Sequence, residues 1–446
     1  MYPSEGLTTA LNKMREMSVK NGSIYHQYVD LVTDSTTIGQ FGAPILDPAN
    51  TAVLNDFFGL LKKVVETAVN TKTFNSPLAQ LEGERMPLGT FIEDVYVNPV
   101  KGRGFDVNDF AGLLQKYEAQ VATQYLAVNS DTQYPVTITR EKVRNAFTTW
   151  SNLEAFITGI INALYNGAYI TRYNQTKGLP LAAFKGGAVK YEVITNPTNA
   201  ATAKALIQKM RADFSKMKVP STQFNAWQDV KGEGAFALKT WSNPEDIVVL
   251  ISADVEALID VEVLAAAFNM DKADFLGRVI VVDDFSQYDD DGQVAVDGSM
   301  IKAMICDRSW FKIKTQDFAM DEFYNANNRT WQYYLNDVRM VNFSLFANAV
   351  AFVTSAPTIN ATDLDLEKSS ITLTAGTTGR VLVDLTPANA TSSISVSSSA
   401  STYATGAMSG RYLVITAKAA GSATLTVTAN GHSDTISVTV EAAPSE

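Results

Sequence analysis

The sequence has one cysteine, Cys306, and two histidines, His26 and His432, among its 446 residues. A single cysteine excludes an intrachain disulfide and fits synthesis in a reducing cytoplasm. A Ser-His-Asp or Cys-His site needs a base within hydrogen-bond reach of its nucleophile, and these histidines fall in different predicted domains. We therefore interpret His26 as packing or polar surface, and Cys306 as a small buried residue of a strand.

Long apolar runs are also missing. The longest, such as residues 247–251 and 349–353, fall far below the roughly 20 residues that cross a bilayer. The first residues lack a basic region followed by an apolar stretch, so we expect no signal peptide and no membrane association. With 36 basic and 47 acidic side chains, the net charge of −11 argues against tight wrapping of nucleic acid.

None of the short motifs that could bind a metal or a nucleotide is complete. Histidine and cysteine clusters with zinc spacing do not occur. The acidic run at 289–292 lacks both end ligands of a calcium loop, so a solvated loop is favoured. The glycines at 232–237 have no clear strand before them, and the turn at 252–254 has no glycine to receive a phosphate. The sequence therefore predicts no cofactor, no metal and no enzyme activity.

The aromatic residues end abruptly. All five tryptophans and all 22 phenylalanines lie at or before Phe352, and only Tyr403 and Tyr412 follow. A chain of 446 residues exceeds the usual size of one core. An aromatic-rich body and a tail with a core of Val, Ile and Leu therefore form two domains, and Pro357 marks the linker.

The body mixes helices and strands. Apolar residues at helical spacing predict helices near 50–68 and 199–217, and a long helix to about residue 166 with Thr139 as its N-cap. Residues 72–138, punctuated by glycine and proline, predict a hairpin-like arm with little core of its own. A strand over 247–251, a helix over 254–270 and a strand over 279–283 predict a small α/β layer with a right-handed crossover. Further strands are predicted over 301–313 and, as one or two strands, over 331–354.

The tail alternates cleanly between apolar and polar residues. Pairs such as Leu413 and Ile415, or Val438 and Val440, are typical of half-buried strands. Asn430-Gly431 is a hairpin-turn dipeptide. Short strands at intervals of 8–12 residues predict an immunoglobulin-like sandwich over 358–442.

Four segments carry a resemblance to a known family. Residues 87–96, 146–166, 251–277 and 346–353 resemble, in the same order, the major capsid proteins of small podoviruses of the Bacillus phage phi-29 type. The resemblance implies an α+β, HK97-like capsid core over 1–356, with an N-terminal arm, an extended loop at 72–138, a peripheral domain with its spine helix at 139–175, and an axial domain at 195–330. It also implies that the tail is a bacterial Ig-like group 2 domain on the shell exterior, although the core tryptophan common in such domains is absent.

The function implied by this resemblance is that of a major capsid protein in a phage head. Copies would form pentamers and hexamers that close into an icosahedral or prolate shell around double-stranded DNA, which is held by confinement without sequence specificity. The expected partners are other copies, a scaffolding protein and a portal, with a weak host-surface contact through the Ig-like domain. We expect synthesis in the bacterial cytoplasm and, with residues 1–446 taken as the assembled protein, no maturation cleavage.

Candidate contacts between subunits are the charged residues of the arm: Arg85, Glu93, Asp94 and Arg103. The alternative is that these charges are ordinary solvated strand faces. We consider two functions other than that of a capsid protein. An exported cell-surface adhesin would explain the Ig-like module, but the chain has no export signal and no repeated modules. A hydrolase with a paired-carboxylate site would need no histidine.

Overall fold

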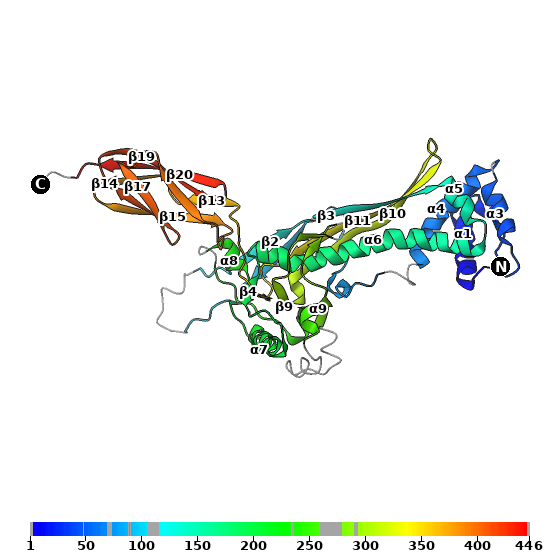
Figure 1. Cartoon of the computed structure of the whole chain (residues 1–446), viewed down its shortest axis with the longest axis horizontal. Coiled ribbons are helices and arrows are strands. Elements are labelled where there is room, and N and C mark those ends of the chain that lie inside the picture. Colours follow the sequence, from blue (N-terminus) through cyan, green and yellow to red (C-terminus); the bar gives the residue numbers. More distant parts are fainter. Residues whose placement is uncertain are drawn as a thin grey trace. The chain divides into compact units, whose positions relative to one another are not determined.

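The computed structural model describes residues 3–47, 49–68, 74–87, 89, 91–104, 116–232, 236–258, 279–289 and 293–443. The chain divides into two compact units, and Figure 1 labels most of their helices and strands. Unit 1 comprises residues 1–92, 126–176 and 312–341, and unit 2 comprises residues 93–125, 177–311 and 342–446. Each unit is therefore built from segments that lie far apart in the sequence. The domain boundaries given above stay predictions.

Unit 1 begins with four helices: α1 Glu5–Asn21, α2 Tyr25–Tyr28, α3 Ile38–Leu46 and α4 Thr51–Ala68. Helix α1 starts where the Ser4 side chain accepts the N–H of Leu7, and it ends at Gly22 with φ 68°. Glycine adopts this left-handed conformation without a steric penalty. Helix α4 confirms the helix predicted near 50–68. The buried faces of these helices form an aromatic core with residues that lie between 138 and 168, and this core includes Phe41, Phe57, Phe58, Phe147 and Trp150.

A three-stranded sheet completes unit 1, in the order β10 Phe311–Asn325, β11 Thr330–Phe343 and β3 Ser130–Thr139. Strands β11 and β12 Ala349–Val353 confirm that residues 331–354 form two strands. The single strand predicted over 301–313 is wrong. A 3₁₀ turn, Arg308–Trp310, divides it into β9 Ile301–Asp307 and β10, because the Asp307 carboxylate accepts the N–H of Ser309 at 2.9 Å.

The long helix predicted to run from Thr139 to about residue 166 is two helices, α5 Arg140–Ala146 and α6 Trp150–Lys185. Thr139 caps α5 as expected, since its hydroxyl accepts the N–H of Lys142. Two further threonines cause the break. Thr148 donates to the carbonyl of Asn145 at 2.7 Å, and Thr149 accepts the N–H of Asn152 at 3.1 Å. Side chains that bond to nearby backbone groups in this way compete with a continuous helix.

The main sheet of unit 2 has the order β4 Lys190–Val193, β12, β9, β5 Ile247–Ser252 and β6 Val279–Val282. Strands β5 and β6 are parallel, as the predicted crossover requires, although most of their connection, residues 259–278, lies outside the described residues. Every residue of β5 is buried, as suits a strand that is interior to its sheet. Helix α7 Ala200–Met217, predicted near 199–217, packs against this sheet. The smaller elements of unit 2 are α8 Trp227–Lys231, η3 Pro244–Asp246, α9 Ala253–Glu256, β7 Gln287–Tyr288 and β8 Val294–Val296.

Within the predicted arm, η1 Ala79–Leu81 precedes two hydrogen-bonded strands, β1 Ile92–Val97 and β2 Val121–Leu126. We call this two-stranded sheet the ribbon. Residues 105–115, which the sequence places between the two strands, lie outside the described residues. The ribbon confirms the strand character predicted from the alternation around Val95 and Val97.

The C-terminal strands form two four-stranded sheets, β13-β15-β18-β17 and β14-β20-β19-β16. Both sheets contribute to one aliphatic core, in which Val383 and Ile415 of the first meet Leu425 and Val438 of the second. This all-β sandwich includes two strands that the sequence reading missed, β13 and β17. The bounds are β13 Asp363–Leu366, β14 Ser370–Thr374, β15 Thr378–Thr386, β16 Ile394–Ser398, β17 Ala404–Ser409, β18 Tyr412–Ala417, β19 Gly421–Ala429 and β20 His432–Glu441.

Candidate assembly surfaces

One face of the ribbon exposes apolar side chains. Val95 and Val97 of β1 are 48% and 56% exposed, and Val121 and Tyr125 of β2 are 50% and 73% exposed. Residues two apart on a strand point to the same face, so the two valines of β1 form one surface. Large apolar side chains gathered on one exposed face mark an interaction surface more often than scattered ones do.

The opposite face of β1 is fixed within unit 2. The Tyr96 hydroxyl donates to the carbonyl of Lys239 at 2.5 Å, and the Asn98 side chain accepts the N–H of Lys239 at 2.9 Å. The Ser344 hydroxyl donates to the Asp94 carboxylate at 2.8 Å. Polar contacts hold the ribbon on one side, where Ala122 and Leu126 are also buried, while Val95, Val97, Val121 and Tyr125 remain exposed on the other.

The four predicted contact residues lie in different surroundings. Arg85, in unit 1, donates to the carbonyl of Gln316 and pairs with Asp317, each at 3.1 Å. Glu93 lies on the exposed face of β1, and Asp94 lies on the opposite face. Arg103 donates to the hydroxyl of Tyr117 and lies 5.6 Å from the centroid of its ring. The structure therefore does not gather the four residues into one site, and their role between subunits stays a prediction.

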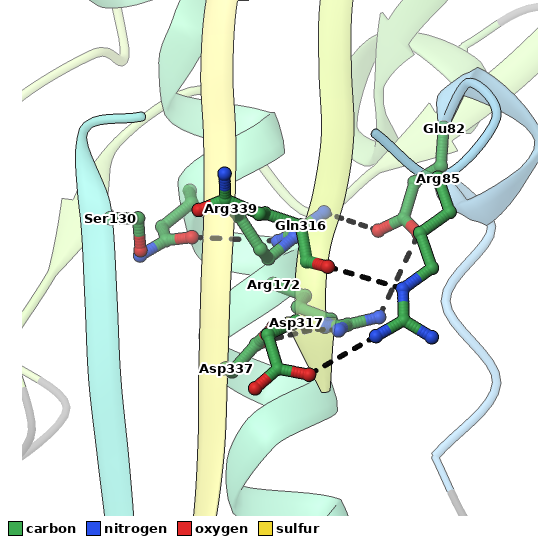
Figure 2. A network of polar contacts seen from close by, with 9 residues as sticks. Glu82, Arg85, Ser130, Arg172, Gln316, Asp317, Asp337 and Arg339 are labelled. Carbon is green, nitrogen blue, oxygen red and sulfur yellow. Dashed lines mark hydrogen bonds and ion pairs between the residues drawn. The ribbon is translucent and has the colours of Figure 1, made fainter. Parts of the chain in front are cut away.

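A cluster of buried charges lies in unit 1, and the sequence reading did not find it (Figure 2). Arg172 of α6 donates from Nε and Nη2 to the two carboxylate oxygens of Asp337 on β11, both at 2.7 Å. Its Nη1 lies 3.7 Å from Glu82, which also pairs with Arg339 of β11. Two arginines and two carboxylates therefore balance one another, and two-pronged pairs of this kind are the strongest charge-assisted hydrogen bonds.

Polar neighbours extend the cluster. Arg339 Nη1 donates to Gln175 at 3.5 Å, and Gln175 in turn donates to Ser130 at the start of β3 at 2.9 Å. The cluster thus joins α6, β3, β11 and the segment that carries Glu82 and Arg85 (Figure 2). That segment also forms backbone hydrogen bonds to β10, from Gly83 to Ile313 and from Met86 to Thr315. The start of the predicted arm is therefore firmly anchored in unit 1.

The surroundings shift the pKa values of the two arginines in opposite directions. Burial tends to lower the pKa of Arg172, but the hydrogen bonds and charge of Asp337 outweigh it, so that this pKa is raised. Burial lowers the pKa of Arg339, and the charge of Glu82 only partly opposes it. Arginine still remains charged, because its ordinary pKa lies above 12. The two arginines therefore stay charged, and the cluster ties together the elements that carry it.

A second charged cluster, around a buried lysine, lies in unit 2. The side chain of Lys177 is fully buried, and its Nζ donates to both carboxylate oxygens of Asp283, at 2.9 and 2.7 Å. Asp284 accepts a hydrogen bond from the Tyr288 hydroxyl at 2.6 Å, which raises the pKa of Tyr288 to about 12. The Tyr288 ring also lies 4.5 Å from Lys177 Nζ. These contacts tie α6 to the chain that follows β6.

The residues considered for catalysis are structural. Cys306 is fully buried in β9, as predicted, and burial raises the pKa of its thiol well above the ordinary value. His26 Nδ1 lies 3.0 Å from the Ser18 hydroxyl, which also accepts the His26 N–H. Among the described residues, no group of three or more His, Cys, Asp or Glu side chains could hold a metal ion. No described helix is both long and apolar enough to cross a membrane.

Known proteins resemble this chain over most of its length. The Phi29-like phage major capsid protein family matches residues 12–353. The major capsid proteins of Bacillus phages PZA and B103 are each 30% identical, over 78% and 77% of this chain and 74% and 72% of their own lengths. A chain in the capsid structure of Staphylococcus phage Andhra has a TM-score of 0.52 at 14% identity, covering 64% of this chain and 86% of that chain, which shows a shared fold.

The family match ends at Val353, the last residue of β12, so that it includes the ribbon and both buried charge clusters but not the C-terminal sandwich. Proteins of this kind are structural and not enzymes, and nothing in the comparisons supports an adhesin. The resemblance inferred from four short segments is confirmed over a much longer range. This chain belongs to the Phi29-like phage major capsid protein family.

Proposed function

We propose that this chain, the major capsid protein of a tailed bacteriophage, adopts the HK97-like fold and builds the head from rings of five and six copies. In this assignment residues 72–138 are the extended loop, 139–175 hold the spine helix and 195–330 form the axial domain. The rings close into an icosahedral or prolate shell around double-stranded DNA. The exposed apolar face of the ribbon carries the proposal, since it lies within the extended loop and is uncovered in the single chain.

The ribbon has the character expected of a contact between copies. Its other side is occupied by contacts such as those of Tyr96 and Asn98 with Lys239, so that only the face bearing Val97, Val121 and Tyr125 is available to a neighbour. Burying an exposed valine contributes on the order of 1 kcal/mol, so each such contact is weak alone. Weak contacts let misplaced copies leave, and their number makes the closed shell durable.

The other partners follow from the same assignment. A scaffolding protein and a portal would guide closure, and packaged DNA would be held by confinement, in keeping with the net charge of −11. The chain would be made in the host cytoplasm. We assign the C-terminal sandwich to an Ig-like domain on the shell exterior, where it decorates the head or contacts the host surface weakly. Its eight strands in two sheets and its aliphatic core support this assignment.

Glutamates placed on the ribbon test the proposal. Val97→Glu with Val121→Glu puts two charges on the apolar face without touching the polar contacts, so we expect a folded chain that sediments as a monomer or small ring. The control pair, Val19→Glu with Val294→Glu, changes two valines that are equally exposed, at 54% each. Both pairs are co-expressed with the phage scaffolding protein and examined by sedimentation velocity and electron microscopy. Closed particles from the ribbon pair would contradict the proposal.

A further inference from the structure

Helix α7 concentrates positive charge on an acidic chain. Residues 199–218 contain five basic residues and one acidic residue, Asp213, whereas the whole chain has a net charge of −11. The Asp213 side chain is only 3% exposed. The charged side chains on the outer surface of the helix are therefore all basic. The five cations are Lys204, Lys209, Arg211, Lys216 and, just after the helix, Lys218.

The exposed face of α7 follows a heptad pattern. Small or uncharged residues recur in alternating steps of four and three, which keeps one line of side chains facing a partner helix. We call this line the α7 seam. Its members are all exposed: Ala201, Ala205, Gln208, Ala212 and Ser215.

The cations lie on both sides of the α7 seam. Lys204, Arg211 and Lys218 recur every seventh residue along one side, and Lys209 and Lys216 do so along the other. In a coiled coil these are the flanking positions, whose charges decide which partner helix is accepted. The sheet of unit 2 fixes the rotation of the helix, because the opposite face is buried against it. That face comprises Ala203, Leu206, Ile207, Met210, Phe214 and Met217.

The two flanks differ in how far their charges are already paired. Lys209 lies 3.6 Å from Glu192 and donates to the carbonyl of Val193 at 3.0 Å, and Lys216 lies 3.1 Å from Asp213. Lys204 and Arg211 have no ion pair among the residues that the structure describes. The flank that carries these two residues is therefore open to an anionic partner.

A hollow adjoins the first two turns of the seam. It has a volume of about 310 Å³ and lies between α7 and β4, lined by Ala201, Ala205, Leu206, Lys209 and Val193 among others. Val193 is 51% exposed. An apolar side chain from a helix lying along the seam would occupy part of the hollow and cover Val193. The surface therefore offers apolar contact as well as charge.

We propose that the α7 seam binds an acidic amphipathic α-helix of another protein. The α7 of a second copy does not fit, since it would place basic flank against basic flank. Nucleic acid fits less well, because the middle of the exposed face is uncharged and the cations keep to its two sides. The inference does not depend on the ribbon or on shell closure, so it stands or fails separately from the function proposed above.

A designed peptide tests the surface directly. The probe is a labelled helix of three heptads with leucine and alanine along its contact line and glutamate at its flanking positions. We expect it to bind the full-length chain in fluorescence anisotropy, and Lys204→Glu with Arg211→Glu to weaken binding at least about tenfold, which corresponds to about 1.4 kcal/mol. The control pair, Lys20→Glu with Lys142→Glu, makes the same change in net charge at exposed sites in unit 1 and leaves binding unchanged.

A seam variant separates helix packing from simple charge attraction. Ala205→Arg with Ala212→Arg adds positive charge but blocks close approach along the seam, so the proposal requires weaker binding. Tighter binding of the acidic peptide to this variant would overturn it. Failure of the peptide to bind the parent chain, or preferential binding of a short DNA duplex over the peptide, would overturn it as well. Circular dichroism confirms that each variant is folded before its binding is compared.

Discussion

The ribbon and the hairpin β19–β20 are both hydrogen-bonded strand pairs rich in valine, yet they place their valines in opposite environments. In the hairpin, Val427 and Val438 are 0% and 1% exposed. In the ribbon, Val97 and Val121 are about half exposed. The difference arises from what lies opposite each pair, because the hairpin faces a second sheet and one face of the ribbon is uncovered. The sandwich covers its valines within one chain, whereas the ribbon leaves one apolar face exposed.

The largest expected effect concerns the anchor of the segment that leads into the ribbon. Arg339→Ala removes a fully buried cation and leaves Glu82 and Asp337 with a single arginine. Breaking a buried pair from one side costs about 3–5 kcal/mol, and we expect the free energy of unfolding to fall by that amount. The control is Arg85→Ala, whose side chain is 64% exposed and whose loss should cost under about 1 kcal/mol. Urea denaturation of the unassembled full chain measures both.

A double variant makes this prediction sharper. Glu82→Gln with Arg339→Met removes charge from both partners, so that no uncompensated carboxylate faces the vacated position. We expect it to recover part of the stability lost in Arg339→Ala, since apolar replacement of a buried pair is often close to neutral. If Arg339→Ala proves no more harmful than Arg85→Ala, the cluster does not anchor this segment.

The next prediction compares the ribbon directly with the hairpin β19–β20. Leu425→Ala in β19 leaves a cavity in the sandwich core, where Leu425 is 0% exposed, and should cost about 3 kcal/mol. Val97→Ala in the ribbon removes two methyl groups from a side chain that is 56% exposed, so we expect a change within about 0.5 kcal/mol. Thermal and urea unfolding of the unassembled chain give both values. Similar losses for the two variants would mean that the ribbon valines are not exposed in solution.

The same contrast explains which elements the sequence predicts. Local sequence pattern is enough to predict helices α4 and α7 and the ribbon strands. It also predicts the turn at Asn430-Gly431, where both residues have a positive φ, a conformation that this dipeptide adopts readily. The division of the long helix depends on the hydroxyls of Thr148 and Thr149, which do not disturb the apolar periodicity. Strand β17 was missed because its sequence, ATGAMS, has little apolar alternation.

The local sequence pattern does not predict the buried charge cluster. Glu82 and Arg339 are 257 residues apart, and nothing in the sequence near either residue identifies the other. One signal was available. Trp331, Tyr333 and Leu335 mark the inward face of β11, and the same alternation continues to Asp337 and Arg339. Charged residues on the inward face of a strand must be paired, and that requirement predicts a cluster without naming its partners.

The smallest effect concerns β4, an edge strand that resembles the ribbon in exposing Tyr191 and Val193, at 41% and 51%. Burial, together with the nearby Asp213, raises the pKa of Glu192 in the folded chain. A carboxyl group with a raised pKa stabilises the fold most at pH values below its unfolded pKa, about 4.3, and this contribution is lost as the pH rises through the folded value. Glu192→Gln does not titrate, so its unfolding temperature relative to the parent should rise between pH 4 and pH 7. A constant difference for Glu192→Gln across this range would mean that neither burial nor Asp213 raises the pKa of Glu192 in the folded chain.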